Sequence, residues 1–234
     1  MSGSTGSIPD RLEEVRHRMA AACNRAGRDE KSVKLVAVSK TFPARDVMQA
    51  VQAGQACFGE SRLQEAEPKL EALPKDIDWH FIGRVQRNKV RKILPLFGTI
   101  HGIDSIKLAH HTDRIAGELA IRPAVYLQVN IGGEESKGGF DVGQIQELAA
   151  ELSQLGNLRI LGLMCIPPVE QDQQAARGWF VRLRELQEKI APEFGSEFDQ
   201  LSMGMSSDYE LAIEEGATVV RVGSAIFGGR DYDE

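Results

Sequence analysis

The 234-residue sequence contains no apolar run of about 18 residues, the minimum that a membrane-spanning helix requires. Its start, MSGSTGSIPD, is small and polar and lacks the basic-then-apolar pattern of a secretory signal or transit peptide. Linkers, low-complexity segments and long blocks of like charge are also absent. These absences predict a single cytoplasmic domain over residues 1–234, with a flexible segment at 1–9 and the folded part at 10–232.

Cysteine is scarce, and the positions exclude the usual cysteine-based sites. Cys23, Cys57 and Cys165 lie far apart and in no CxxC or Cys/His ligand spacing. No disulfide framework and no metal site is therefore predicted, and we expect reduced, mostly buried thiols. The 28 basic and 34 acidic residues give a net charge of −6, which argues against general nucleic-acid binding.

Short apolar runs alternate with amphipathic stretches along almost the whole chain. A leading helix is predicted at 10–26, and Gly27 is its C-terminal stop. Strands are predicted at 34–39, 56–59, 79–83, 99–102, 124–130, 159–166, 198–203 and 219–222. Helices are predicted at 43–54, 61–72, 86–94, 105–120, 142–155, 170–191 and 206–215. This α/β pattern predicts a single (β/α)8 TIM-type barrel with an extra N-terminal helix, and a doubly wound open sheet is the alternative.

Polar residues stand at the predicted carboxyl ends of strands, where barrels of this type carry their chemistry. Lys40 ends the first strand, "VKLVAVSKTFP", just before a proline-marked turn. The segments after the seventh and eighth strands, 202–208 and 221–227, are rich in glycine and serine. Loops at these two positions, together with the start of a short helix, commonly bind phosphate in barrels. The sequence thus predicts an amine and an anion site at one mouth of the barrel.

An amine that faces a phosphate site suggests a Schiff base with a phosphorylated carbonyl compound. Two ligand types fit this chemistry: pyridoxal phosphate, or a sugar phosphate as in a Schiff-base aldolase. Burial and a nearby Arg221 would both favour the neutral, reactive amine of Lys40. The alternative is a lysine that only extends from a strand end into solvent.

Several long motifs follow one another in the order known from one family. They are "VAVSKTFP", "FGESRLQE", "WHFIGRVQRNKVRK", "VNIGGEESKGGF", "GLMCIPP" and "LSMGMSSDYELAIEEGATVVRVGSAIFG". From about residue 11 to 232 the chain resembles the pyridoxal phosphate homeostasis protein family, also called the YggS/PROSC family. The resemblance implies a barrel like the N-terminal domain of alanine racemase, with pyridoxal 5'-phosphate held as a lysine imine. It also implies a role in vitamin B6 homeostasis, in which the protein buffers or delivers the cofactor.

The resemblance also implies which residues hold the cofactor. By this similarity, Lys40 carries the imine and Arg221 meets the pyridine nitrogen. The phosphate is held by Ser206, Gly223 and Ser224.

Weaker candidates complete the predicted site. Ser61 stands where the family usually has asparagine, so a polar contact there is open, whereas Ser224 keeps the hydroxyl of the common threonine. His80, at a strand end, is a candidate for lining the site. Met164 either packs against the cofactor ring or belongs to the core.

The competing function is that of a pyridoxal phosphate-dependent, racemase-like enzyme. Arg221 would donate to the pyridine nitrogen without leaving a proton on it, which makes the ring a poor electron sink. A racemase also needs a second base, and in alanine racemases this is a tyrosine from a second β domain that we do not expect here. Tyr126, Tyr209 and Tyr232 are expected to be structural. No catalytic residue and no turnover are therefore predicted.

The expected partners are pyridoxal phosphate and, as recipients, apoenzymes that use it, and the missing second domain favours a monomer. Lys137 is either a second, transient amine or a solvated loop lysine. A cluster of cations suggests a third function class, an adaptor that binds nucleic acid or protein. The preferred interpretation is a solvated or anion-binding face, and no nucleic-acid or membrane partner is predicted. The cluster comprises Arg84, Arg87, Lys89, Arg91 and Lys92.

Overall fold

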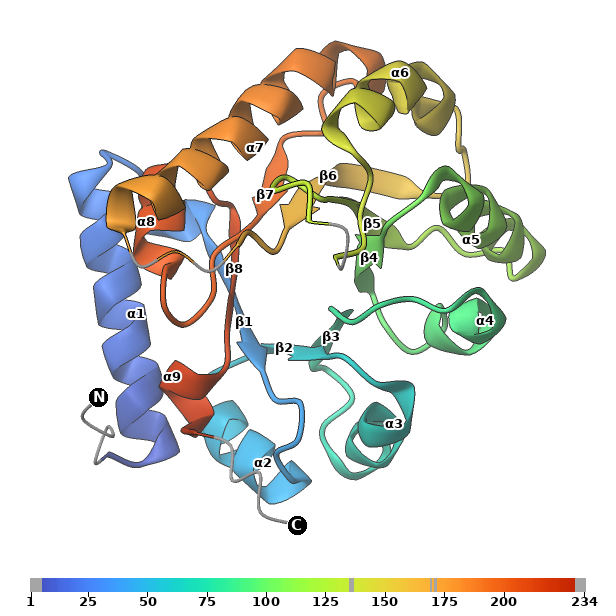
Figure 1. Ribbon diagram of the computed structural model, residues 1–234. Helices are drawn as coiled ribbons and strands as arrows, with labels where there is room; N and C mark the ends of the chain where they lie inside the picture. Colours follow the sequence, from blue (N-terminus) through green and yellow to red (C-terminus); the bar gives the residue numbers. More distant parts are fainter. Residues whose placement is uncertain (1–5, 135–136, 169, 171, 230–234) are drawn as a thin grey trace.

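The computed structural model describes residues 6–134, 137–168, 170 and 172–229. Eight parallel strands pair in chain order, and β8 returns to β1, so the sheet closes into a barrel (Figure 1). They are β1 (Lys34–Val38), β2 (Cys57–Glu60), β3 (Asp78–Phe81), β4 (Thr99–Ile103), β5 (Ala124–Val129), β6 (Arg159–Cys165), β7 (Gln200–Ser202) and β8 (Val219–Val222). The predicted barrel is confirmed, because an open sheet would leave two edge strands unpaired.

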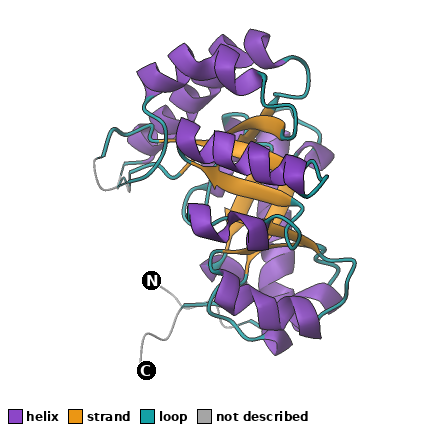
Figure 2. Cartoon of the chain, turned by 90° about the vertical axis from the view of Figure 1, so that its right-hand side faces the viewer, coloured by secondary structure: helices purple, strands orange, loops and turns teal. Residues whose placement is uncertain are grey.

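Helices surround the strands on the outside of the barrel (Figures 1 and 2). They are α1 (Ile8–Arg25), α2 (Ala44–Gln52), α3 (Leu63–Ala72), α4 (Val90–Ile93), α5 (Ile106–Glu118), α6 (Val142–Ser153), α7 (Gln173–Phe194), α8 (Tyr209–Glu214) and α9 (Ser224–Phe227), with the short 3-10 helices η1 (Glu30–Ser32) and η2 (Arg87–Lys89). The extra N-terminal helix α1 packs against α8 and α9, the last two helices of the chain. In the described part of the chain, no helix is long and apolar enough to cross a bilayer.

Helix α1 begins at Ile8, earlier than the predicted start at residue 10. The reason is a capping box. The Ser7 hydroxyl accepts the Asp10 N–H at 3.4 Å, and the Asp10 carboxylate accepts the Ser7 N–H at 2.9 Å. Of the segment expected to be flexible, residues 1–5 lie outside the described residues, and Ile8 and Pro9 are helical.

Several other boundaries shift by a few residues, and two of these shifts have a visible cause. The helix predicted at 86–94 is split into η2 and α4, and its first residue, Gln86, makes no side-chain capping bond. Strand β7 has 3 residues, fewer than the range 198–203 predicted for it, because Phe198 already belongs to a turn that its N–H closes on the Gly195 carbonyl at 3.2 Å. Both differences shorten elements and leave their order unchanged.

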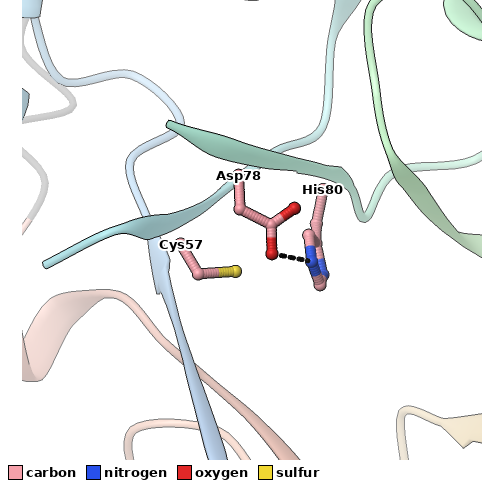
Figure 3. Close-up of side chains that lie close together, drawn as sticks. All are labelled: Cys57, Asp78 and His80. Carbon is pink, nitrogen blue, oxygen red and sulfur yellow. Dashed lines mark hydrogen bonds and ion pairs between the residues drawn. The ribbon is translucent and has the colours of Figure 1, made fainter. Parts of the chain in front are cut away.

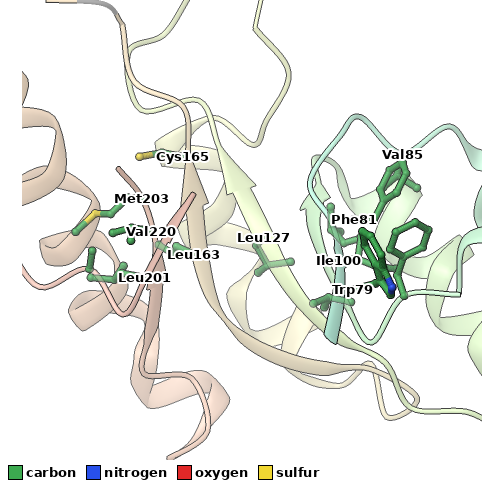
Figure 4. Packing of buried hydrophobic residues seen from close by; sticks show 14 of the residues in the cluster. Trp79, Phe81, Val85, Ile100, Leu127, Leu163, Cys165, Leu201, Met203 and Val220 are labelled. Atoms are coloured by element: carbon green, nitrogen blue, oxygen red, sulfur yellow. The ribbon is translucent and has the colours of Figure 1, made fainter. Parts of the chain in front are cut away.

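Alternate strand residues point to two different compartments. Outward-facing residues such as Trp79, Phe81, Ile100 and Leu127 pack between the strands and the helices (Figure 4). The inward-facing set fills the barrel and includes an apolar cluster of Val36, Cys57, Ala124, Tyr126, Leu161, Met164 and Val219. All three cysteines are buried and unpaired, as the sequence predicts.

Candidate functional site

Lys40 lies in a tight turn directly after β1. The Phe42 N–H donates to the Ser39 carbonyl at 3.1 Å, which closes a turn around the two residues between them. The second of these, Thr41, has a φ of 71°, a left-handed conformation that a non-glycine residue keeps only when its surroundings hold it. The Glu65 carboxylate on α3 holds it by accepting the Thr41 N–H at 3.1 Å. The backbone that carries the half-buried Lys40 side chain is therefore fixed.

A buried polar cluster anchors the residue that precedes Lys40. The Ser39 hydroxyl donates to Glu60 Oε1 at 2.7 Å. Lys69 Nζ donates to the same oxygen at 2.6 Å and to the Ser39 carbonyl at 2.7 Å. The side chains of Glu60 and Lys69 are 0% and 8% exposed. The cluster therefore ties the end of β1 to β2 and α3 in the protein interior.

The electrostatics of this cluster leave the carboxylate only partly satisfied. Burial raises the pKa of the Glu60 carboxyl, and the ammonium of Lys69 opposes that rise. Glu60 Oε2 is buried and makes no hydrogen bond with the described residues. The buried charge of Glu60 therefore depends on the ammonium of Lys69 for its stabilisation. The sequence analysis missed this pair, although a lysine on the buried face of an amphipathic helix is the signal that would have found it.

The predicted phosphate residues come together at the same mouth. Ser206, in the loop after β7, accepts the N–H groups of Gly223 and Ala225 at 3.1 and 3.3 Å. A Cβ on Gly223 would lie 3.3 Å from the Cβ of Val38, so the turn after β8 packs against the end of β1. Val38 precedes Lys40 by two residues. A hydroxyl and two backbone donors thus converge beside the Lys40 turn.

Gly204 shapes the loop that carries Ser206. Its φ is +91°, and a Cβ there would lie 2.6 Å from the Cβ of Ala212 on α8. Only glycine fits a position with both restrictions. Ser224, also predicted to hold phosphate, is exposed and begins α9.

Arg221 points from β8 into the barrel and is only 5% exposed. Its Nη1 donates to the Ser202 hydroxyl at 2.6 Å, and its Nη2 donates to the Cys165 carbonyl at 2.8 Å. These partners end β7 and β6, so the guanidinium lies near the carboxyl ends of the strands. Burial lowers the pKa of Arg221, but a guanidinium remains charged. A buried cation held by neutral groups is suited to receive an acceptor atom from a ligand.

Two weaker candidates also lie near this end of the barrel. Ser61 is half-buried in the loop after β2, and a Cβ on Gly83 would lie 2.1 Å from the Ser61 carbonyl oxygen. Met164 is buried inside the barrel and pairs in register with Ser202. This burial corresponds to the second of the two roles expected for Met164, packing in the core.

His80 faces the other end of the barrel. Its Nε2 lies 3.2 Å from Asp78 Oδ2, and its Nδ1 lies 2.9 Å from His101 Nε2. His80 lines a cavity formed by the amino-terminal ends of the strands, together with Lys34 and Asp78. The structure therefore does not bring His80 together with the Lys40 turn.

A chain of hydrogen bonds connects Arg221 to Asp78 through the barrel. It runs from Ser202 to His101 Nδ1, at 2.8 Å, and on through His80. Burial, His80 and Arg221 lower the pKa of His101 well below its usual value, so its imidazole is neutral. The sequence analysis missed this chain, although "DWHF" and "TIHGI" put both histidines on the inward side of their strands.

Lys137 is a half-buried loop lysine with two partners. Its Nζ donates to the Pro167 carbonyl at 3.1 Å and pairs with the Glu134 carboxylate. Of the predicted basic cluster, Arg91 pairs with Glu118 on α5. The other members lie on or beside η2 and α4, and Lys89 alone among them is half-buried.

Comparisons with known proteins agree with this architecture. Residues 11–231 match the family described as "Alanine racemase, N-terminal domain". A pyridoxal phosphate homeostasis protein from Aquifex aeolicus is 42% identical over 95% of this chain and 98% of its own. One from Pseudomonas aeruginosa is 44% identical over 97% of each chain.

A solved structure is similar over nearly the whole chain. PipY from Synechococcus elongatus PCC7942, determined without PLP, superposes with a TM-score of 0.86 at 39% identity, over 95% of this chain and all (100%) of PipY. The same protein with PLP bound gives a TM-score of 0.82 at 40% identity, with the same coverage. The barrel and its loops are thus shared with a protein that has been seen both with and without this ligand.

Proposed function

The chain belongs to the family of the pyridoxal phosphate homeostasis proteins, and from this premise we propose that it binds pyridoxal 5'-phosphate and keeps a releasable reserve of it. The observation that carries the proposal is the convergence at one barrel mouth of the Lys40 turn and the donors around Ser206. Arg221 is buried near the same end of the barrel and its hydrogen-bond partners are neutral, so it is suited to contact the pyridine nitrogen of this ligand. PipY, a relative of similar fold, has been seen with PLP bound.

The residues divide the recognition of the ligand between them. Pyridoxal phosphate supplies an aldehyde that bonds to an amine, a phosphate group and a pyridine nitrogen. In our proposal Lys40 provides the amine from a turn that holds its backbone in place. The N–H groups of Gly223 and Ala225, now directed at the Ser206 hydroxyl, turn to phosphate oxygens together with that hydroxyl and Ser224. Arg221 donates to the pyridine nitrogen.

We further propose that the protein holds the ligand without catalytic turnover. Arg221 keeps no proton on the pyridine nitrogen, which disfavours carbanion chemistry. Tyr126 lies inside the barrel and donates to Gln200 at the start of β7. Tyr209 is buried on α8, and burial raises the pKa of its hydroxyl to about 12. Neither is suited to be the second base of a racemase, and Tyr232 lies outside the described residues.

The covalent bond to Lys40 is the first test. Purified protein loaded with pyridoxal phosphate is expected to show a near-visible absorption band that borohydride bleaches, and peptide mapping should place the reduced label on Lys40. Lys40→Ala should abolish both, because no other amine occupies that turn. Lys137→Ala is the matched control and should retain them, since Lys137 is paired with Glu134. A full band and label in Lys40→Ala would overturn the assignment. Racemisation of an amino acid by the loaded protein would overturn the carrier role.

The Ser206 hydroxyl is the second test. Ser206→Ala should weaken pyridoxal phosphate binding roughly tenfold, the size of one hydrogen bond to a charged group. Binding of pyridoxal, which lacks the phosphate, should change little. Ser207→Ala is the control, because Ser207 is exposed in the same loop. Equal losses for both ligands would place the phosphate elsewhere.

The remaining elements of the proposal concern partners and place. We propose that the protein acts in the cytoplasm as a monomer and passes the cofactor to apoenzymes that use it. Ser224 at the barrel mouth is exposed, which supports access for a recipient. Transfer of the near-visible band from the loaded protein to a pyridoxal phosphate-dependent apoenzyme, measured against free ligand, would test delivery directly.

A further inference from the structure

The barrel has a second functional feature at the end opposite to Lys40. A cavity of about 610 Å³ opens there, among the first residues of the strands. Its lining includes Lys34, Asp78, Thr99, Gln200 and Val219, which begin β1, β3, β4, β7 and β8. Barrels of this type carry their active sites at the opposite, carboxyl-terminal face, so this cavity lies apart from the Lys40 mouth.

We propose that Cys57, Asp78 and His80 form a site for a divalent transition-metal ion of the zinc type at this cavity. Cys57 begins β2, and the other two lie on β3, both facing inward. The cysteine sulfur, a carboxylate oxygen and an imidazole nitrogen of these residues all lie within 4.8 Å of one another (Figure 3). Zinc prefers this set of donor types, and three protein ligands leave a fourth position open to the cavity.

The distances suit a tetrahedral ion after a small adjustment. Zinc bonds of about 2.0–2.3 Å put neighbouring ligand atoms about 3.3–3.6 Å apart. His80 Nε2 and Asp78 Oδ2 are already 3.2 Å apart. The Cys57 sulfur lies within 4.8 Å of both atoms, so a movement of at most about 1.5 Å would complete the third corner. The thiol proton leaves to solvent as the metal–sulfur bond forms, and two anionic ligands then balance the charge of the ion.

His80 is also oriented as metal-bound histidines are. Such a histidine binds the metal with one ring nitrogen and donates from the other to a second group, which fixes the ring. The second nitrogen of His80 lies 2.9 Å from His101 Nε2, and His101 is held in turn by Ser202 at 2.8 Å. In the metal-bound form the ring proton of His80 lies on Nδ1 and is donated to His101 Nε2, which leaves Nε2 unprotonated for the ion; the hydrogen-bond chain described above then supplies the outer support of the site.

Lys34 competes with the ion for Asp78. Its Nζ lies 3.1 Å from Asp78 Oδ2, but its side chain is 53% exposed and can turn toward solvent. In the metal-bound form we expect Lys34 to pair with the other carboxylate oxygen. The linear sequence gave no sign of the site because Cys57 and Asp78 are brought together by the pairing of β2 with β3, in direct register.

The test is titration of metal-stripped, full-length protein with Zn²⁺ in competition with a chromophoric chelator. One equivalent should bind, and Co²⁺ in its place should give thiolate-to-cobalt absorption. Cys57→Ser and His80→Gln should each weaken binding by more than about tenfold, and His101→Phe by about ten- to a hundredfold. Cys165→Ser, which removes another buried thiol, is the matched control. Circular dichroism confirms that each variant is folded.

Lys34→Met provides a readout that a merely structural cluster would not give. Removing the competing cation should tighten zinc binding about tenfold, whereas Lys31→Met, on the same cavity but without a bond to Asp78, should not. Zinc binding that is unchanged in Cys57→Ser and His80→Gln, or absent from the wild-type protein, would overturn the proposal. Because Lys40 takes no part, neither outcome depends on the binding of pyridoxal phosphate.

Discussion

Lys69→Met is expected to lower the free energy of unfolding by about 3–5 kcal/mol, because it leaves the Glu60 carboxylate buried without its counter-ion. Lys69 is the sole charged partner of Glu60 within 4 Å among the described residues. Glu60 Oε2 already lacks a hydrogen-bond partner in that part of the chain. Urea unfolding, followed by circular dichroism, measures the loss.

The loss should also depend on pH, and its sign follows from the Glu60 carboxyl. Burial raises the folded-state pKa of Glu60, and Lys69 opposes that rise. Without Lys69 the folded pKa rises further, so the folded variant takes up a proton at a pH where the unfolded chain does not. Folding is therefore favoured as pH falls through the folded pKa toward the ordinary value of 4.5. The destabilisation of Lys69→Met should be largest at neutral pH and shrink toward acid.

The double variant Lys69→Met/Glu60→Gln is the control for this prediction. Replacing both charges should recover part of the stability, since a buried pair is often no more stable than neutral groups of similar volume. It should not recover the geometry of the Lys40 turn, because the Ser39 carbonyl still lacks the donor from Lys69. An unfolding free energy of Lys69→Met that stays within 1 kcal/mol of wild type at neutral pH would show that water or relaxation satisfies Glu60 instead.

The barrel was predictable because its signal is repeated. Each of the eight strands found in the structure overlaps a predicted strand. The prediction depends on the alternation of strands with helices, which the spacing of the apolar residues shows along the whole chain. The errors fall at ends, where a single contact decides. The Ser7–Asp10 capping box extends α1 beyond its apolar face, and no side chain caps the helix at Gln86. Such contacts are weaker than the periodic signal and involve residues outside it.

The site was less predictable, because its geometry depends on contacts between distant strands. Position after a strand was the signal that predicted Lys40 as a site residue, and the resemblance to a family predicted Ser206 and Arg221. His80 was expected at the mouth because it lies near a predicted strand end, but in the structure it pairs with Thr99, the first residue of β4, and so faces the amino-terminal end of the barrel. His101 was not considered, because one inward-facing histidine on a strand has no meaning until the barrel brings it beside His80.

Arg221→Met is expected to separate ligand binding from stability. Pyridoxal phosphate affinity should fall by roughly ten- to a hundredfold, the value of a hydrogen bond from a charged donor. The unfolding free energy of the ligand-free protein should stay the same or rise by up to about 2 kcal/mol. The charge of Arg221 is buried, and its hydrogen-bond partners among the described residues are neutral. An apolar side chain of similar size avoids the free-energy cost of removing that charge from water.

One loss opposes this gain in the variant. The Cys165 carbonyl loses its donor from Nη2, which costs about 1–3 kcal/mol if water does not replace it. Ser202 keeps its contact with His101 Nδ1 and is therefore not left without a partner. Equilibrium unfolding in urea without ligand, and titration of the near-visible band with pyridoxal phosphate, measure the two effects on one preparation.

Arg221→Lys is the matched variant, because it keeps the charge and loses the planar fork that contacts Ser202 and Cys165 together. It should be less stable than Arg221→Met without ligand, since it still buries a cation but holds it with fewer bonds. Its affinity should lie between those of wild type and Arg221→Met. If instead Arg221→Met unfolds more easily by over 3 kcal/mol and binds normally, the arginine supports the barrel and leaves recognition to Lys40 and Ser206.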